Sequence, residues 1–305
     1  MSKFLILLLL LFSLVVPSYA VSTQVDIFRI QAPDQDLLRK TSTIMISARV
    51  ELEKLLGAKI QDTINIFIAE NRYDFDTATF GGVPDWGIGV AQSQKKLIAV
   101  MSPTGENYNQ PFREILRHEL AHIALFYRTD GNRIPRFMNE GVAMLFAHQW
   151  GFGDEMTLAK AKMTGSYLTL AQIDQVNMLN SAQAQIAYAE SYQAVKYIIN
   201  TYGAQTLSDL LDGFKSGRDR DYIFKQVLGM DFAGFDKMFA VYLSNHYHWL
   251  MLFTDPNILW IGLALLFILG FLLVRRRRKS IYKKWEDEEK LESTDFDYEE
   301  SSPWD

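Results

Sequence analysis

The sequence His118-Glu119-Leu120-Ala121-His122 carries the strongest structural signal in the chain. If this segment is helical, the two histidines stand at positions i and i+4, so both imidazoles lie on one face and can bind the same tetrahedral metal ion. Glu119 then lies beside the open coordination position, where its carboxylate can act as a general base towards water. The pentapeptide therefore predicts a metal site on a helix.

A second motif, Asn139-Glu140-Gly141-Val142-Ala143, follows the first after a short interval. A zinc site that acts on a substrate needs a third protein ligand and keeps its fourth position open. Glu140 is the candidate for that third ligand. The alternative is that His118, Glu119 and His122 are ordinary polar residues of an amphipathic helix, but the downstream motif is an independent coincidence in favour of the metal site.

The residues around the two motifs predict a pair of helices. Apolar residues are dense over Glu114 to Tyr127, as in a buried helix. The loop that follows contains Thr129-Asp130-Gly131-Asn132, and Pro135 stands where proline commonly opens a helix. The second helix is expected over Phe137 to Trp150, with Glu140 near its start and facing back towards the histidines.

Together the two motifs resemble those of the gluzincin metallopeptidases, and the residues of both motifs are similar to those of the zinc aminopeptidases in that group. The plan of the chain looks most like the peptidase MA-like domain proteins of bacteria, over about Thr63 to Tyr242. This resemblance implies an α+β, thermolysin-like catalytic domain, with a small mixed sheet followed by a helical lobe. It also implies one Zn²⁺ per chain, with His118, His122 and Glu140 as ligands and Glu119 as the general base.

A third segment, Ala187 to Tyr192, resembles the helix on which this family presents a tyrosine to the substrate carbonyl. A phenol there can stabilise the oxyanion that forms when a peptide bond is attacked. Tyr188 is the preferred candidate, as a second catalytic residue. Tyr192 lies one turn along the same face and stays an alternative, as does a purely structural role for both as core residues.

Upstream of the motifs the sequence predicts a sheet. Ile64 to Ile68 reads as a strand, and Gly87 to Ala91 with Leu97 to Met101 reads as a hairpin. In the gluzincins an edge strand holds the extended substrate by main-chain hydrogen bonds. Either Gly89 to Gln92 or Leu97 to Met101 can serve, and a sheet with no role in substrate binding is equally economical.

Further helices are expected on both sides of this core. Gln35 to Leu56 reads as an amphipathic opening helix, and Ser208 to Phe224 with Phe232 to Tyr247 as helices after the site. His148 lies two turns beyond Glu140 on its predicted helix, so we expect it to be a core residue or a neighbour of the ligands rather than a ligand.

Two apolar segments predict where the domain resides. Residues 1–20 have the plan of a cleavable secretory signal peptide, with an uncut signal anchor as the alternative. Residues 258–274 form an uncharged apolar run long enough for a transmembrane helix. The cations Arg275 to Lys279 follow it and belong on the cytoplasmic side. Residues 21–250 are therefore expected to form an extracytoplasmic domain on a single-pass cell membrane protein.

The C-terminal part, residues 275–305, is a basic juxtamembrane segment followed by an acidic tail. Trp285 to Asp305 contains ten acidic residues and one lysine, a composition that cannot bury a core and predicts disorder in the cytoplasm. A docking peptide for a cytoplasmic partner is the alternative interpretation of this tail.

Composition excludes several classes of function. The chain has no cysteine, which excludes thiolate ligands, disulfides and cysteine nucleophiles, and favours a bacterial cell envelope over a disulfide-stapled ectodomain. Its net charge is −5, and no basic, aromatic-rich patch indicates nucleic-acid binding.

These expectations converge on a membrane-anchored zinc peptidase that acts on a peptide or protein substrate outside the cell membrane. No counterpart of the glycine-rich exopeptidase motif of the aminopeptidases precedes the HExxH motif at His118 to His122. That departure favours an endopeptidase. The alternative is a catalytically silent protein of the same fold that binds peptides, or an envelope assembly or sensor protein whose tail recruits cytoplasmic partners.

Overall fold

The computed structural model describes residues 20–85, 87–103, 111–175, 179–247 and 256–292. Except for Ala20, the predicted signal peptide lies outside these residues. The contacts divide the chain into two units, residues 1–249 and residues 250–305, and each is described by itself.

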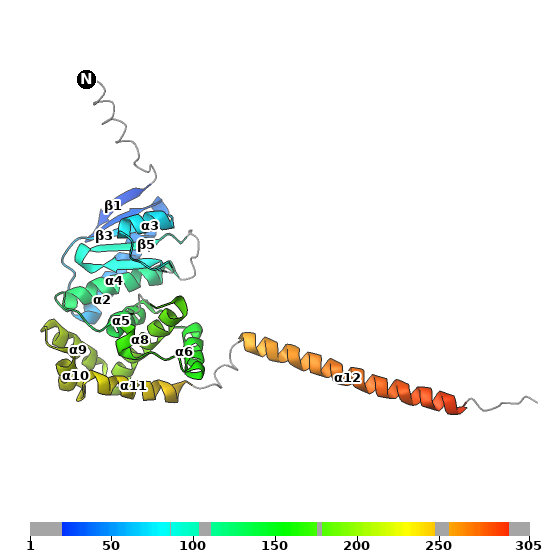
Figure 1. The fold of residues 1–305 in the computed structure, drawn as a ribbon. Coiled ribbons are helices and arrows are strands. Elements are labelled where there is room, and N and C mark those ends of the chain that lie inside the picture. The colour runs from blue at the N-terminus through cyan, green and yellow to red at the C-terminus, as the bar shows by residue number, and fades with distance from the viewer. Residues whose placement is uncertain (1–19, 86, 104–110, 176–178, 248–255, 293–305) are drawn as a thin grey trace, which may run out of the picture. The chain divides into compact units, whose positions relative to one another are not determined.

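The first unit begins with a mixed five-stranded sheet (Figure 1). Its strands are β1 (Val21–Val25), β2 (Phe28–Ala32), β3 (Ile64–Ala69), β4 (Gly89–Gln92) and β5 (Leu97–Met101). The order is β1-β2-β3-β5-β4, in which the three inner strands are parallel and the two edge strands run antiparallel to their neighbours. The predicted strand and hairpin are confirmed, whereas the β1–β2 hairpin was not predicted.

Ten helices of the first unit are described. They are α2 (Gln35–Leu56), α3 (Arg72–Thr79), α4 (Phe112–Arg128), α5 (Arg136–Ala147), α6 (Phe152–Thr164), α7 (Leu170–Ile173), α8 (Ser181–Tyr202), α9 (Ala204–Lys215), α10 (Arg220–Leu228) and α11 (Phe232–His246). The first unit is therefore a mixed α/β structure, mostly helical with a small sheet.

Side chains alternate between the two faces of the sheet, so β3 and β5 are largely covered on both faces, whereas the exposed Arg29 and Gln31 lie on an uncovered face of β2. Ala69 of β3 and Ala99 of β5 share one cluster with Phe75 of α3. Helices α2 and α4 also contact the sheet, α2 at β1 and β2 and α4 at β4 and β5. Helix α4 is thus held directly beside the edge strand β4.

Helix α4 is a core helix, as its apolar pattern predicts. Its largely inaccessible apolar residues are Ile115, Leu116, Leu120, Ile123 and Ala124. His118 and His122 leave this core on a less buried face. The buried Arg117 donates two hydrogen bonds to Glu51 of α2 and two to the carbonyl of Phe146 of α5, so the three helices are tied together.

The predicted single helix over Ser208 to Phe224 is wrong. The structure has two helices, because Gly217 adopts a left-handed backbone with φ of +70° and interrupts the run. Asp219 then opens α10, since its side chain accepts hydrogen bonds from the backbone N–H groups of Asp221 and Tyr222.

The second unit contains the helix α12 (Pro256–Glu292), 37 residues long. Its stretch Leu259–Lys290 includes an 18-residue window with mean hydropathy 2.0, long and apolar enough to cross a membrane. The helix also continues past the apolar run, so the predicted disorder of the tail is wrong for Trp285 to Glu292. A carboxylate and a lysine stand four residues apart there, in Glu286 and Lys290, a spacing that stabilises helices in water. Residues 293–305 lie outside the described residues.

Candidate metal centre

Three predicted ligands come together between α4 and α5. His118 and His122 lie one turn apart on α4, and Glu140 lies near the start of α5. Their ligand atoms all lie within 4.8 Å of one another. Oε2 of Glu140 is 3.3 Å from Nε2 of His118 and 3.6 Å from Nε2 of His122. Two imidazole nitrogens and one carboxylate oxygen therefore converge on one point.

The orientation of both imidazoles is set by amide groups behind them. Nδ1 of His118 lies 2.6 Å from Oε1 of Gln149, and Nδ1 of His122 lies 3.0 Å from Oδ1 of Asn139. An amide oxygen only accepts hydrogen bonds, so each Nδ1 carries the proton and donates it. The lone pair of each ring is then on Nε2, the atom that faces Glu140.

This donor set fits a zinc ion. Zinc is held tetrahedrally by imidazole nitrogen and carboxylate oxygen at about 2.0–2.1 Å, so two ligand atoms of one ion lie roughly 3.3–3.4 Å apart. The two distances from the Glu140 oxygen to the histidine nitrogens are close to that value. Two histidines and one glutamate also leave the fourth position to water or substrate.

Glu119 lies beside the cluster and is almost fully buried. Burial raises the pKa of its carboxyl to about 7, and the backbone of Ala91 in β4 forms a hydrogen bond with it. Gly89 makes this approach of strand and helix possible, because a Cβ there would lie only 2.7 Å from Oε1 of Glu119. A carboxylate with a proton affinity near neutrality can both accept and return a proton.

Arg136 and Tyr188 complete the surroundings of Glu140. Nε of Arg136 lies 2.7 Å from Oε1 of Glu140, and the side chains of Arg136 and Tyr188 are hydrogen-bonded. Burial alone would raise the pKa of Glu140, but neighbouring positive charge, including that of Arg136, outweighs burial and holds that pKa well below its ordinary value. The third candidate ligand is thus a carboxylate.

The two tyrosines of α8 have different surroundings. Tyr188 lines the same cavity as His118 and Glu119, and burial raises the pKa of its phenol. Tyr192 instead stacks on Trp150, with ring centroids 4.5 Å apart and an interplanar angle of 10°. Only Tyr188 of the pair is therefore placed beside the candidate ligands.

The edge strand beside the centre is β4, since β5 is paired on both sides. The Ile88 carbonyl accepts a hydrogen bond from the Met101 N–H, and backbone groups alternate along an antiparallel ladder. Gly89 and Ala91 consequently direct their backbone groups away from β5, towards the free edge. The hydrogen bond between Ala91 and Glu119 shows that this edge faces the cluster.

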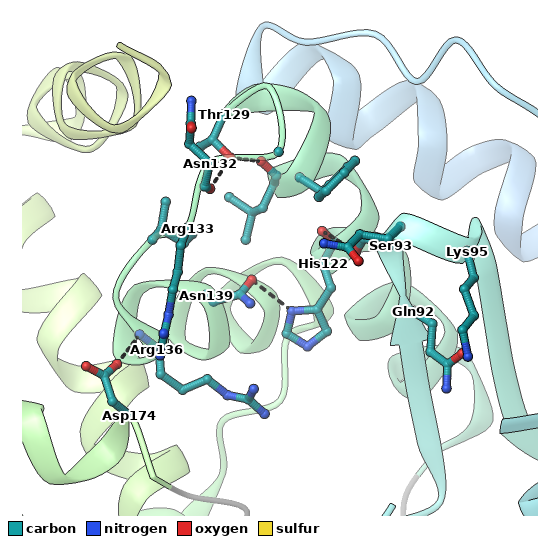
Figure 2. A pocket seen from close by; sticks show the side chains of 15 residues that line it. Gln92, Ser93, Lys95, His122, Thr129, Asn132, Arg133, Arg136, Asn139 and Asp174 are labelled. Atoms are coloured by element: carbon teal, nitrogen blue, oxygen red, sulfur yellow. Dashed lines mark hydrogen bonds between the residues drawn. The ribbon is translucent and has the colours of Figure 1, made fainter. Parts of the chain in front are cut away.

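The cluster has a cavity on either side. The cavity beside His122 has a volume of about 580 Å³ and is lined by Asn139 and Arg136, whose side chains are drawn in Figure 2. The cavity beside His118 has a volume of about 620 Å³ and is lined by Glu119 and Tyr188. A chain that passes the cluster has space on both sides.

Sequence reasoning missed Gln149 and Arg136 as parts of the site, and it considered Gly89 only as part of a candidate edge strand. Arg136 stands four residues before Glu140, a helical spacing that could have indicated the contact. Gln149 follows the end of α5 in a loop whose path the sequence does not specify. His148 ends α5 in a left-handed conformation, with φ of +61°, and is exposed, so the expectation of a core position was wrong. It lines the cavity beside His118 and stands outside the cluster, as expected of a neighbour that is not a ligand.

Comparison with known proteins agrees with this geometry. The sequence profile of the Peptidase MA superfamily matches residues 45–245, which is roughly two thirds of the 305 residues and includes α4, α5 and α8. No curated protein matches the chain. The matched region contains all three residues of the metal cluster, and the chain belongs to the Peptidase MA superfamily.

Proposed function

We propose that the protein is a zinc-dependent peptidase in which His118, His122 and Glu140 hold one Zn²⁺ per chain. Family membership indicates a metallopeptidase-like protein. The observation that carries the proposal is the convergence of two Nε2 atoms on one Glu140 oxygen, at 3.3 and 3.6 Å, with both Nδ1 atoms engaged by amide oxygens.

The residues around the ligands have complementary chemical roles. When bound, zinc supplies a Lewis acid that polarises the scissile carbonyl and lowers the pKa of water. Glu119 accepts a proton from the attacking water and passes it to the leaving amine. The phenol of Tyr188 donates a hydrogen bond to the oxygen that gains negative charge. Arg136 keeps Glu140 ionised and, through its hydrogen bond, positions Tyr188.

The substrate is a peptide or protein that binds as an extended strand along β4. The outward backbone groups of Gly89 and the outward carbonyl of Ala91 are suited to pair with such a chain, whereas the Ala91 N–H already donates to Glu119. Space on both sides of the cluster favours an endopeptidase, because residues before and after the scissile bond both need room. The thermolysin-like arrangement of sheet and helical lobe belongs to the same proposal.

Membrane anchoring is also proposed. Residues 1–20 serve as a signal peptide, residues 21–250 as the extracytoplasmic catalytic domain, and residues 258–274 of α12 as the membrane span. The apolar stretch of α12 and the cations Arg275 to Lys279 support this topology by the positive-inside rule. The tail, residues 275–305, then lies in the cytoplasm.

The experiment compares cleavage of casein and a peptide library by the full-length chain in detergent, as wild type and as Glu119→Gln. Cleavage by zinc-loaded wild type, with a loss of at least about 10³-fold in Glu119→Gln at unchanged zinc content, supports the proposal. Zinc binding without any cleavage by the wild type would instead indicate the silent peptide-binding or sensor protein.

A further inference from the structure

The two cavities beside the cluster, which we treat as the halves of one candidate substrate cleft, differ in charge. The half beside His122 is lined by Lys95, Arg133 and Arg136 and by one carboxylate, that of Asp174. The half beside His118 is lined, apart from Glu119, by the carboxylates of Glu114 and Asp154 and by neither lysine nor arginine among the described residues. A substrate that spans the cleft meets cations on one side and carboxylates on the other.

Much of the charge in the first half is already paired. Asp174 accepts a hydrogen bond of 2.9 Å from the backbone N–H of Arg136, and it lies 3.6 Å from a guanidinium nitrogen of Arg220. The guanidinium of Arg136 lies against Glu140. These groups hold the start of α5 in place and neutralise one another.

Lys95 and Arg133 provide the remaining positive charge of this half. Both are exposed, and they come from opposite walls of the cavity, the β4–β5 connection and the loop before α5 (Figure 2). The ammonium of Lys95 lies 4.3 Å from the centre of the Phe80 ring. Within the part of the chain that the structure describes, neither residue has a carboxylate within ion-pair distance. Two cations are thus available to a negatively charged ligand.

The other half is unsuited to an acid. Glu114 forms no ion pair with a described residue. The carboxylate of Asp154 accepts a hydrogen bond from the backbone N–H of Gly151 at the start of α6, and it has no cationic partner among the described residues. The rest of the lining includes the apolar side chains of Ile88, Ile115, Met144 and Trp150. An acidic side chain would meet like charge there and would lose solvation.

The direction of β4 relates these halves to the direction of the substrate. Its first residue, Gly89, approaches Ile115 and Glu119, and Ser93, just after its end, lies 3.5 Å from the His122 carbonyl. An antiparallel partner is the slightly more stable addition to a strand. Such a partner places its N-terminal half beside His122, next to Lys95 and Arg133.

We propose that the protein selects peptides with an acidic side chain N-terminal to the scissile bond, bound between Lys95 and Arg133. This inference rests on the proposed peptidase function. It assigns a substrate class to the cleft, and it makes Lys95 and Arg133 determinants of specificity rather than catalytic residues.

The test uses two peptides of identical composition and net charge. One has glutamate two residues before the scissile bond and glutamine two residues after it, and the other has these residues exchanged. With the zinc-loaded full-length chain in detergent, we expect kcat/KM to be roughly tenfold higher for the first peptide, because two exposed cations each contribute modestly. The ratio should fall as salt is raised from 50 to 500 mM.

Charge-removing variants assign the effect to the two cations. In Lys95→Gln/Arg133→Gln the ratio should fall to roughly one to threefold, with cleavage retained. The matched control is Arg29→Gln/Lys225→Gln, which removes two exposed cations from outside both halves and should keep the wild-type ratio.

Three outcomes separate this inference from the proposed function. Equal cleavage of both peptides would overturn the acidic preference and leave the peptidase intact. Faster cleavage of the exchanged peptide would overturn the assignment of acid to the N-terminal side. Cleavage of neither peptide, nor of casein, by zinc-loaded protein would overturn both proposals together.

Discussion

Gly141 of α5 lies directly against the carbonyl oxygen of Ser191 of α8. A Cβ at Gly141 would be 2.2 Å from that oxygen and 2.6 Å from a methyl group of Val195. The two helices meet at this closest approach, with Glu140 one residue away on α5 and Tyr188 one turn away on α8. The glycine of the second motif therefore brings a candidate ligand and the candidate oxyanion donor into one site.

Substituting Gly141 with alanine should separate the helices. Because the obstructing atom is backbone, α8 must move, and we expect a loss of about 2–4 kcal/mol in unfolding free energy, at the upper end of overpacking effects. Thermal unfolding of the full-length chain in detergent measures it. Gly153→Ala is the matched control, since a Cβ at Gly153 meets nothing within 4 Å. Equal melting temperatures for the two variants would refute the close approach.

Gly89→Ala should impair catalysis without removing the metal. The new Cβ would lie 2.7 Å from Oε1 of Glu119 and 2.8 Å from a methyl group of Ile115, so the general base must shift. A displacement of about 1 Å costs on the order of 10²-fold in rate. We expect kcat to fall by that factor while zinc content stays at the wild-type level. A wild-type kcat would show that Glu119 is not positioned by β4.

Gln149→Ala should weaken zinc binding by about 10- to 100-fold, because Nδ1 of His118 loses the acceptor that fixes its ring and tautomer. Competition with a chromogenic chelator measures the change in Kd. Gln149→Glu keeps an acceptor in place and should restore tight binding, whereas Gln149→Asn is too short to reach. An unchanged Kd in Gln149→Ala would mean that the hydrogen bond does not orient His118.

Glu190 should make stability depend on pH. It is fully buried on α8, and burial raises its pKa from 4.5 to about 8, although the backbone N–H of Leu168 donates to it. The folded state therefore binds the proton more tightly than the unfolded state. The contribution of Glu190 to the unfolding free energy is fully present below about pH 4.5, and a few kcal/mol of it are lost as the pH rises to about 8.

The measurement is the melting temperature between pH 5 and pH 9, for the wild type and Glu190→Gln. The decline should be smaller in the variant, which keeps the contribution of Glu119, and the exposed Glu70→Gln should keep the full decline. A decline of the same size in Glu190→Gln would assign the effect to another group, such as Glu119, whose pKa burial also raises.

The sequence predicts the local structure around the motifs well. Spacing within HELAH and the apolar period of α4 place both histidines on one helix, and Gln35–Leu56 is a helix as predicted. Two of the parts it does not predict depend on long-range packing and have no local sequence signal: Gln149 reaches His118 from a loop, and β4 becomes the edge strand only through sheet order. The break between α9 and α10 is different, because Gly217 and the N-cap residue Asp219 are local signals that outweigh the helical period.

The most direct test of the metal centre is zinc content per chain, measured by mass spectrometry on the full-length protein after dialysis, for wild type, His118→Ala, His122→Ala, Glu140→Ala and His148→Ala. His148 lines the same cavity as His118 but stands outside the cluster, so it is the matched control. We predict about one zinc in the wild type and in His148→Ala, and well under half in the three ligand variants. Zinc at the wild-type level in all three ligand variants, or no zinc in the wild type, would contradict the account.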